Sequence, residues 1–270
     1  MGDSVKICFW VIAVLVGCAA GPAAKAPDDS VIISPYVSTP PVIDADLSDW
    51  DTSKFITVTP ENGVFDLELG PDAHSDDAEN LSFRFGVAND DEYLYVACIV
   101  KDDVIVLDTN TDPTAKHCQA WKDDTVEIFI DGNHNHNPDR GGDELLTGGE
   151  FSTVANGAVT SWSSSAPGKE GDPDYWESAA SYPPPPAPAY QAPWDTETGE
   201  YTVEVRLNFR VMGPTVGPGS TIGFTISPQD DDDGGDEEYS LYWKGVTPRT
   251  HWIESGWGDV VLSTRPADDD

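Results

Sequence analysis

Apolar side chains at every second position are the feature that most restricts the fold of this chain. In residues 201–209 they alternate with polar side chains, and they are Tyr201, Val203, Val205, Leu207 and Phe209. A period of two places such side chains on one face of a β-strand. No long stretch has helical periodicity, so the sequence predicts an all-β protein.

Several other segments have strand character and are separated by loops rich in Gly, Asn, Asp and Pro. They are residues 81–87, 93–100, 125–130, 151–162, 221–227, 238–243 and 258–263. The turn signal Asn89-Asp90-Asp91 predicts that the first two form a hairpin. Roughly nine short strands of this kind predict an antiparallel β-sandwich of the jelly-roll or immunoglobulin-like type.

One folded domain is expected over residues 39–265, followed by an acidic tail at 266–270. Residues 163–195 interrupt the strand pattern and contain four consecutive prolines at 183–186. Proline cannot donate a ladder hydrogen bond, so this insertion is expected to be a long surface excursion.

The N-terminus carries an export signal. Lys6 precedes an apolar run at 7–17, which has the length of a signal-peptide core and is too short to span a bilayer. The run ends in LVGC at 15–18, which resembles a bacterial lipobox. We therefore expect removal of residues 1–17, a lipid on Cys18 and a flexible tether over 18–38. The alternative is an ordinary secretory signal cut at Ala20 or Ala24.

The lipobox interpretation predicts a lipoprotein of the bacterial cell envelope or surface that contacts the membrane through its anchor only. The 49 acidic residues against 14 basic ones give a net charge of −35. A nucleic acid partner is not expected, because phosphate binding requires clustered Lys and Arg. We expect a monomer.

Two cysteines, Cys98 and Cys118, lie in the predicted domain. A disulfide between them would close a loop of about 20 residues and contribute roughly 3 kcal/mol in the chain-entropy model. Cys98 also lies in an apolar strand, where a buried free thiol is common. Both alternatives remain open.

The segment WKDDTVEIFID at 121–131 combines an aromatic residue with a carboxylate. Its alternation puts Val126, Ile128 and Ile130 on one face and Glu127 on the other. A glutamate within an apolar strand is costly unless its carboxylate is paired with another group or faces a groove filled with water. Trp121 beside Glu127 is typical of sugar recognition, in which a ring stacks on the sugar and a carboxylate accepts its hydroxyls. The alternative is a core tryptophan with a structurally paired glutamate.

Three tryptophans lie close together near the C-terminus. Trp243 ends an alternating strand and is expected in the core, and Trp257 precedes the last strand and is expected to close one end of the sandwich. Trp252 lies in a loop without a strand to bury it, which makes it the best candidate for an exposed platform.

The order of these segments resembles the family 9 carbohydrate-binding modules, within the wider DOMON-like sandwiches. The matching pieces are VIDADLSDW at 42–50, EYLYV at 92–96, VKD at 100–102, WKDDTVEIFID at 121–131, GEYTVEV at 199–205, IGF at 222–224, Trp252 and Trp257-Gly258. They extend over nearly the whole predicted domain.

The resemblance implies a non-catalytic module that binds a polysaccharide or oligosaccharide between two tryptophans and assists glycan degradation. By position, Trp121 and Trp252 would stack on the sugar and Glu127 would bind its hydroxyls. Ser152 stands where the family has an arginine, and Ser227 where it has an amide.

Two other functions fit such a sandwich. The first is a haem-binding DOMON-type electron-transfer domain, for which Met212 is the only methionine outside the signal. The second is a surface scaffold without a sugar ligand. A glycosidase is not expected. Carboxylate pairs do not indicate one in a chain with 49 acidic residues, and the sequence shows no additional domain that could be catalytic.

Two acidic loops suit calcium, which takes oxygen ligands. The candidate ligands are Asp131 and Asn133 in one loop and Asp230 and Asp232 in the other. The resemblance adds structural calcium to the expectation and brings in Asp102. His134 and His136 would suit zinc, but no third soft ligand lies near them in the sequence.

Overall fold

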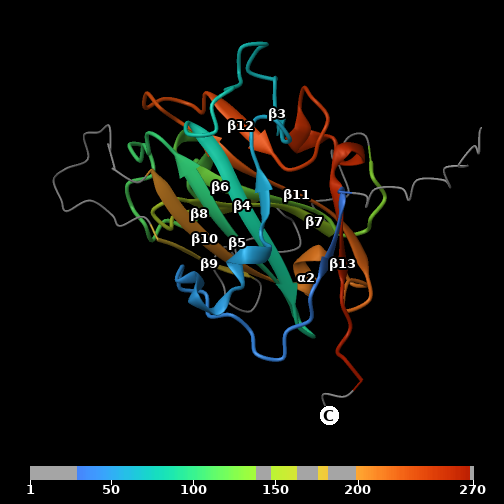
Figure 1. Cartoon of the computed structure of the whole chain (residues 1–270). Helices are drawn as coiled ribbons and strands as arrows, with labels where there is room; N and C mark the ends of the chain where they lie inside the picture. Colours follow the sequence, from blue (N-terminus) through green and yellow to red (C-terminus); the bar gives the residue numbers. More distant parts are fainter. Residues whose placement is uncertain (1–28, 138–146, 163–175, 182–198, 268–270) are drawn as a thin grey trace, which may run out of the picture.

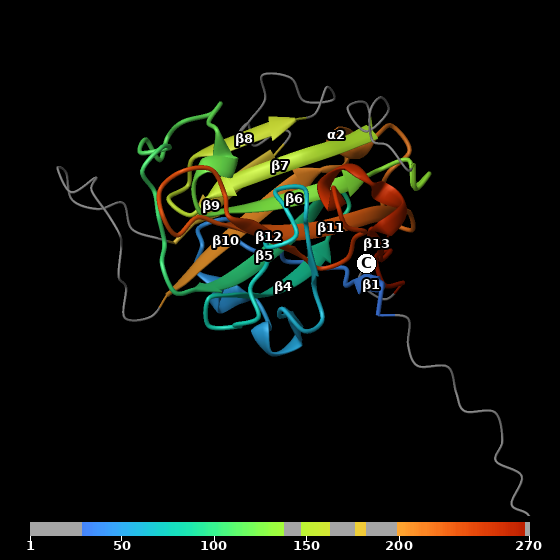
Figure 2. The same cartoon turned by 90° about the horizontal axis from the view of Figure 1, so that it is seen from above.

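A computed structural model describes residues 29–137, 147–162, 176–181 and 199–267. In these ranges the chain forms an eight-stranded and a five-stranded sheet that pack face to face (Figures 1 and 2). All strand pairs are antiparallel except β1 with β13, so the predicted β-sandwich is confirmed.

The eight-stranded sheet has the order β1-β13-β11-β6-β7-β8, with β12 beside β11 and β3 beside β12. Its strands are β1 (Val31–Ser34), β3 (Val64–Phe65), β6 (Thr125–Asp131), β7 (Gly148–Val154), β8 (Val159–Trp162), β11 (Thr221–Asp230), β12 (Tyr239–Tyr242) and β13 (Gly258–Leu262).

The five-stranded sheet has the order β2-β4-β5-β10-β9. Its strands are β2 (Ile56–Val58), β4 (Leu81–Asn89), β5 (Tyr93–Asp102), β9 (Trp176–Ala180) and β10 (Glu200–Asn208). The short helix α2 (Phe209–Met212) follows β10, and 3₁₀ turns form at Leu47–Asp49, Thr52–Lys54, Ala120–Lys122, Thr250–Trp252 and Glu254–Gly256. No described helix has the length and hydrophobicity needed to cross a membrane.

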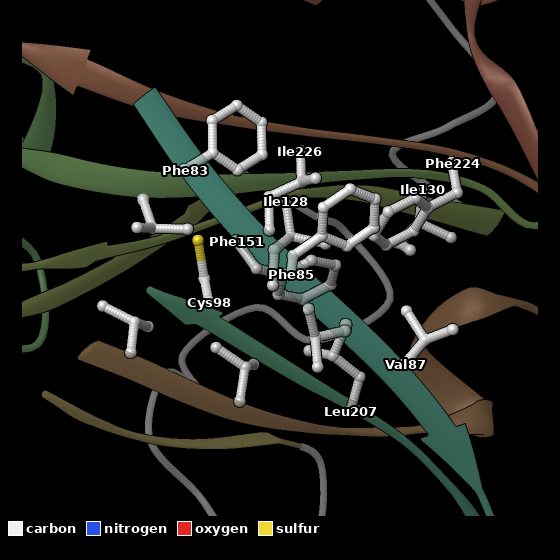
Figure 3. Close-up of a cluster of buried hydrophobic side chains, with 14 of the residues drawn as sticks. Phe83, Phe85, Val87, Cys98, Ile128, Ile130, Phe151, Leu207, Phe224 and Ile226 are labelled. Carbon is white, nitrogen blue, oxygen red and sulfur yellow. The ribbon is translucent and has the colours of Figure 1, made fainter. Parts of the chain in front are cut away.

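The core lies between the two sheets and is built by the alternation that the sequence predicts. Figure 3 shows part of it, with Phe83 and Phe85 from β4 facing Ile128 from β6 and Phe224 from β11. β4 and β5 form the predicted hairpin. Trp243 is buried against Phe85 and Phe224, as expected.

Three predicted boundaries differ from the structure. Residues 31–34 of the expected tether form β1, which pairs in parallel with β13 because its backbone completes the sheet edge. Residues 176–180 of the expected surface excursion form edge strand β9 on β10. Residues 1–28 with Cys18, the rest of the insertion except 181, and 268–270 lie outside the described ranges.

Cys98 and Cys118 are free thiols in the structure, so the predicted alternative of a disulfide is not formed there. Cys98 points into the core (Figure 3). Cys118 is partly buried and packs against the core residues. Burial raises the pKa of Cys98 and raises that of Cys118 to about 12, which keeps both thiols protonated near neutral pH.

The segment 42–50 forms no strand and contains the 3₁₀ turn Leu47–Asp49. A buried carboxylate, Glu204 of β10, holds it instead on the outer face of the five-stranded sheet. Glu204 accepts hydrogen bonds from the backbone N–H groups of Asp44 and Ala45 at 3.1 and 2.6 Å. It also accepts one from Trp50 Nε1 at 2.7 Å. These three bonds replace the ladder bonds of a strand.

Replacement of this carboxylate tests the anchor. Glu204→Ala removes the acceptor of three hydrogen bonds, one of which, from the Ala45 N–H, is buried, so the free energy of unfolding should fall by about 2–4 kcal/mol in urea denaturation. Glu200→Ala, at an exposed position of the same strand, should change it by less than about 0.5 kcal/mol. Equal effects of the two substitutions would contradict the anchor.

Candidate functional site

A groove with a volume of about 270 Å³ opens on the outer face of the eight-stranded sheet. β6, β7, β11 and β12 provide its floor through Glu127, Glu150, Gln229 and Tyr242. The volume lies near the lower end of the range for small-molecule pockets, about 300–1,000 Å³.

Glu127 lies in the floor of the groove and is only 6% exposed. Its alternation in β6 directs it away from Val126 and Ile128, which are in the core. Gln229 Nε2 donates to Glu127 Oε2 at 2.7 Å and Ser152 Oγ donates to Oε1 at 3.3 Å. The carboxylate is therefore held in one orientation by groups from both neighbouring strands.

Strand register places aromatic residues on both sides of Glu127. Trp121 lies in the turn before β6, near the first residue of that strand, Thr125. The Thr125 hydroxyl fixes this turn by donating to the carbonyl of Ala120 at 2.7 Å. At the other end, Phe129 pairs with Glu150 and Glu150 pairs with Trp162. The two ends are four residues apart, about 13 Å at the usual rise of a strand.

The predicted platform Trp252 stacks on Trp162, with ring centroids 5.2 Å apart and planes at 22°. The Arg249 guanidinium lies 5.1 Å from the centroid of the Trp252 ring. Trp121 and Trp162 are 41% and 39% exposed. Trp162 was not among the predicted site residues, because the insertion begins directly after it. Its alternation with Thr160 in β8 was a usable signal.

His251 and Asp66 form a second polar wall of the groove. His251 Nδ1 lies 2.7 Å from Asp66 Oδ2, and the backbone N–H of Arg249 donates to Asp66 Oδ1 at 2.7 Å. Burial alone would raise the pKa of Asp66, but the hydrogen bonds from His251 and from backbone N–H groups outweigh it and lower the pKa.

The groove has an acidic lining, with carboxylates from Asp66, Glu68, Glu127, Glu150 and Glu237. Burial raises the pKa of Glu237 to about 7, and its backbone N–H donates to the carbonyl of Trp121 at 3.1 Å. Such a surface accepts hydrogen bonds from hydroxyl groups and repels anions.

The two predicted serines lie beneath the groove rather than in it. Ser152 has no exposed surface and hydrogen-bonds Glu127. Ser227 is also buried, and its hydroxyl donates to the carbonyl of Pro228. The amide that reaches Glu127 belongs to Gln229, two residues further along the same face of β11.

A second cluster of carboxylates closes one end of the sandwich. Asp102 ends β5 in one sheet, while Asp124 precedes β6 and Asp230 ends β11 in the other. All three are buried, and one oxygen of each lies within 4.8 Å of the others. Asp102 also forms such a group with Asp103 and Asp232.

Several oxygens of this cluster accept no hydrogen bond in the described residues. They are Asp102 Oδ2, Asp124 Oδ1, both oxygens of Asp230 and Asp232 Oδ1. The other oxygens of Asp102 and Asp124 accept the backbone N–H groups of Val104 and Val106. Burial raises the pKa of Asp102 to about 7, that of Asp230 to about 9 and that of Asp124 as well.

The other two predicted metal ligands do not join this cluster. Asp131 accepts the backbone N–H groups of Asn135 and His136 at 3.3 and 3.0 Å. Asn133 donates to the Thr147 hydroxyl at 3.1 Å. Met212, considered above as a haem ligand, is buried in α2.

The sandwich and its groove define a ligand-binding module, and sequence similarity assigns the chain to a known family. The family described as "carbohydrate family 9 binding domain-like" matches residues 66–147 and 174–265. The chain belongs to this family, and its domain is a non-catalytic binding module, as the resemblance implied.

Two curated relatives are endo-1,4-β-xylanases A. That of Thermotoga maritima is 27% identical over 223 residues, and that of Thermotoga neapolitana is 25% identical over 230. Each match includes 82% of this chain but 17% of the xylanase, so the chain spans about a sixth of these relatives.

Solved structures of the same family share the fold. A family 9 module from Caldicellulosiruptor kristjanssonii in complex with cellotriose superimposes with a TM-score of 0.61 at 18% identity, over 89% of this chain and 97% of that one. The same module in complex with glucose gives a TM-score of 0.59 at 19% identity, over 89% and 99%.

Proposed function

We propose that the groove above Glu127 binds a neutral sugar at the end of a glucan or xylan chain. The observation that carries the proposal is Glu127, which Gln229 and Ser152 orient between Trp121 and the stacked pair Trp162–Trp252. A fixed carboxylate accepts hydroxyl donors, while the exposed rings cover the apolar C–H faces of a pyranose.

The second tryptophan platform differs from the one that the family resemblance implies. Trp252 already stacks on Trp162, so the second platform is the pair rather than Trp252 alone. The acidic lining favours neutral glycans, because the five carboxylates of the groove would repel the carboxylate or sulfate groups of an anionic glycan. The complexes of a related module with cellotriose and glucose support a neutral ligand.

We further propose that the chain serves glycan degradation at the bacterial surface, held by a lipid on Cys18. The family match to part of two xylanases supports a partnership with a glycan-degrading enzyme. The sequence LVGC at 15–18 supports the anchor.

We also propose that the cluster of Asp102, Asp124 and Asp230 holds Ca²⁺, with Asp232 beside it. Its buried oxygens without donors fit a hard cation that takes six to eight oxygen ligands. The ion would join the ends of strands from both sheets and supply the positive charge that these carboxylates otherwise lack.

The sugar site is tested by calorimetry with cellotriose and xylotriose in the presence of Ca²⁺. Trp121→Ala and Glu127→Ala should each weaken binding at least about tenfold. Glu127→Ala removes hydrogen bonds to a charged group, which contribute about 1.5–3 kcal/mol, and Trp121→Ala exposes apolar surface whose burial contributes about as much. Trp121→Phe keeps a ring for stacking and should retain most of the affinity, and Glu200→Ala should retain all of it. Unchanged binding by both alanine variants would refute the groove.

The calcium site is tested by thermal unfolding with a chelator. Because the folded pKa values of Asp102 and Asp230 are raised, the folded chain keeps protons that the unfolded chain loses. This cluster therefore destabilises the metal-free protein increasingly as the pH rises from about 4 to about 9. Ca²⁺ should raise the Tm more at pH 8 than at pH 5.

Asp230→Asn keeps the shape and removes a carboxyl group that must take up a proton to be buried in the metal-free protein. In the chelator at pH 8 it should have a higher Tm than the unsubstituted protein, and it should gain little from Ca²⁺. Asp236→Asn, at an exposed position of the same loop, should respond to Ca²⁺ normally. A calcium response that survives in the Asp230 variant would exclude this cluster as the site.

The lipid anchor is tested by metabolic labelling of the expressed protein with a fatty acid analogue. The chain should be labelled and remain with membranes, and Cys18→Ala should be neither labelled nor retained. Equal labelling of both proteins would contradict the anchor.

A further inference from the structure

We propose that His134, His136 and Asp259 form a binding site for a transition-metal ion, Zn²⁺ in the first place, separate from the acidic cluster. The two histidines lie in the loop after β6, and Asp259 lies in β13. His134 Nε2 is 3.0 Å from Asp259 Oδ1 and 3.0 Å from His136 Nε2. His136 Nε2 is 3.6 Å from the same Asp259 oxygen.

These three atoms have the spacing of metal ligands. In a tetrahedral site with bonds of about 2.0–2.1 Å, neighbouring ligand atoms lie about 3.3 Å apart. The observed triangle has sides of 3.0, 3.0 and 3.6 Å. Its circumscribed circle has a radius of about 1.9 Å, so a single ion can lie about 2.0–2.1 Å from all three atoms.

Hydrogen bonding alone satisfies this triangle poorly. A neutral imidazole nitrogen carries either one proton or one lone pair, so His134 Nε2 has one hydrogen at most for two partners. Protonating both histidines would place two N–H groups against each other at 3.0 Å. A metal ion removes the conflict, since it accepts the lone pairs of both rings and balances the charge of Asp259.

Strand pairing and one glycine position the residues of this site. Asp131, Gly223 and Asp259 are register partners on the adjacent strands β6, β11 and β13. A Cβ atom at Gly223 would lie 2.9 Å from Cβ of Asp131, so glycine leaves the space in which that side chain lies. Asp131 accepts the backbone N–H of His136 and thereby holds the loop that carries both rings.

The ligand set identifies the class of ion. Two imidazoles and one carboxylate suit zinc and related divalent metals, whereas Ca²⁺ takes oxygen ligands. The three side chains are 32%, 37% and 26% exposed, which leaves a side open for a water molecule as fourth ligand. The ion would tie the loop after β6 to β13 two residues beyond Trp257, which packs on Phe129.

The site is tested by titrating the purified chain with Co²⁺ while excess Ca²⁺ occupies the acidic sites. One Co²⁺ per chain should bind, with the visible spectrum of a four-coordinate ion and without the intense near-ultraviolet band of a thiolate complex. One equivalent of Zn²⁺ should displace it and raise the Tm. The absent thiolate band distinguishes this site from the cysteines.

Variants assign the ligands. His134→Gln, His136→Gln and Asp259→Asn should each weaken Zn²⁺ binding at least about 100-fold. His74→Gln removes an exposed histidine elsewhere and should bind like the unsubstituted chain. Equal Tm values of the variants and the unsubstituted chain without Zn²⁺ would establish that the fold is intact. Co²⁺ binding that stays tight in the three ligand variants, or that is six-coordinate in the unsubstituted chain, would overturn the proposal.

Discussion

Carboxylates from both sheets are buried together at one end of the sandwich. Asp102 comes from one sheet and Asp124 and Asp230 from the other, so the sheets meet where like charges are packed together. Removing a charge from water without a partner costs several kcal/mol, and each further like charge adds to that cost. The conformation of this end therefore depends on what neutralises the cluster, which is a proton at low pH and, under the proposal above, Ca²⁺ at higher pH.

The same end of the sandwich positions the groove. Asp124 is followed directly by β6, which carries Glu127, and the turn Ala120–Lys122 with Trp121 ends just before it. Asp230 follows Gln229, the donor to Glu127, and opens the loop from which Glu237 reaches the carbonyl of Trp121. The floor and one wall of the groove are thus continuous with the residues that hold the two sheets together. Removal of the proposed Ca²⁺ should therefore weaken sugar binding even though no residue of the groove is substituted.

Much of this could be predicted from the sequence because it follows from local periodicity. The alternation of β4, β5, β6 and β10 predicts the core, and it also directs Glu127 away from that core. What could not be predicted depends on pairing between distant strands. The stack of Trp162 on Trp252 requires β8 to reach the loop beyond β12, and Asp259 lies 125 positions from His134. The role of Glu204 could not be predicted because its three donors lie 154 to 160 positions away from it in the sequence.

The proposed sugar position on Glu127, between Trp121 and the stacked pair Trp162–Trp252, can be tested with a crystal structure of the chain grown with Ca²⁺ and cellotriose. We expect electron density for a terminal glucose in the groove, with a hydroxyl within hydrogen-bonding distance of the Glu127 carboxylate and the ring over Trp121. Cellotriose bound on another face of the sandwich, with the groove filled by water alone, would contradict it.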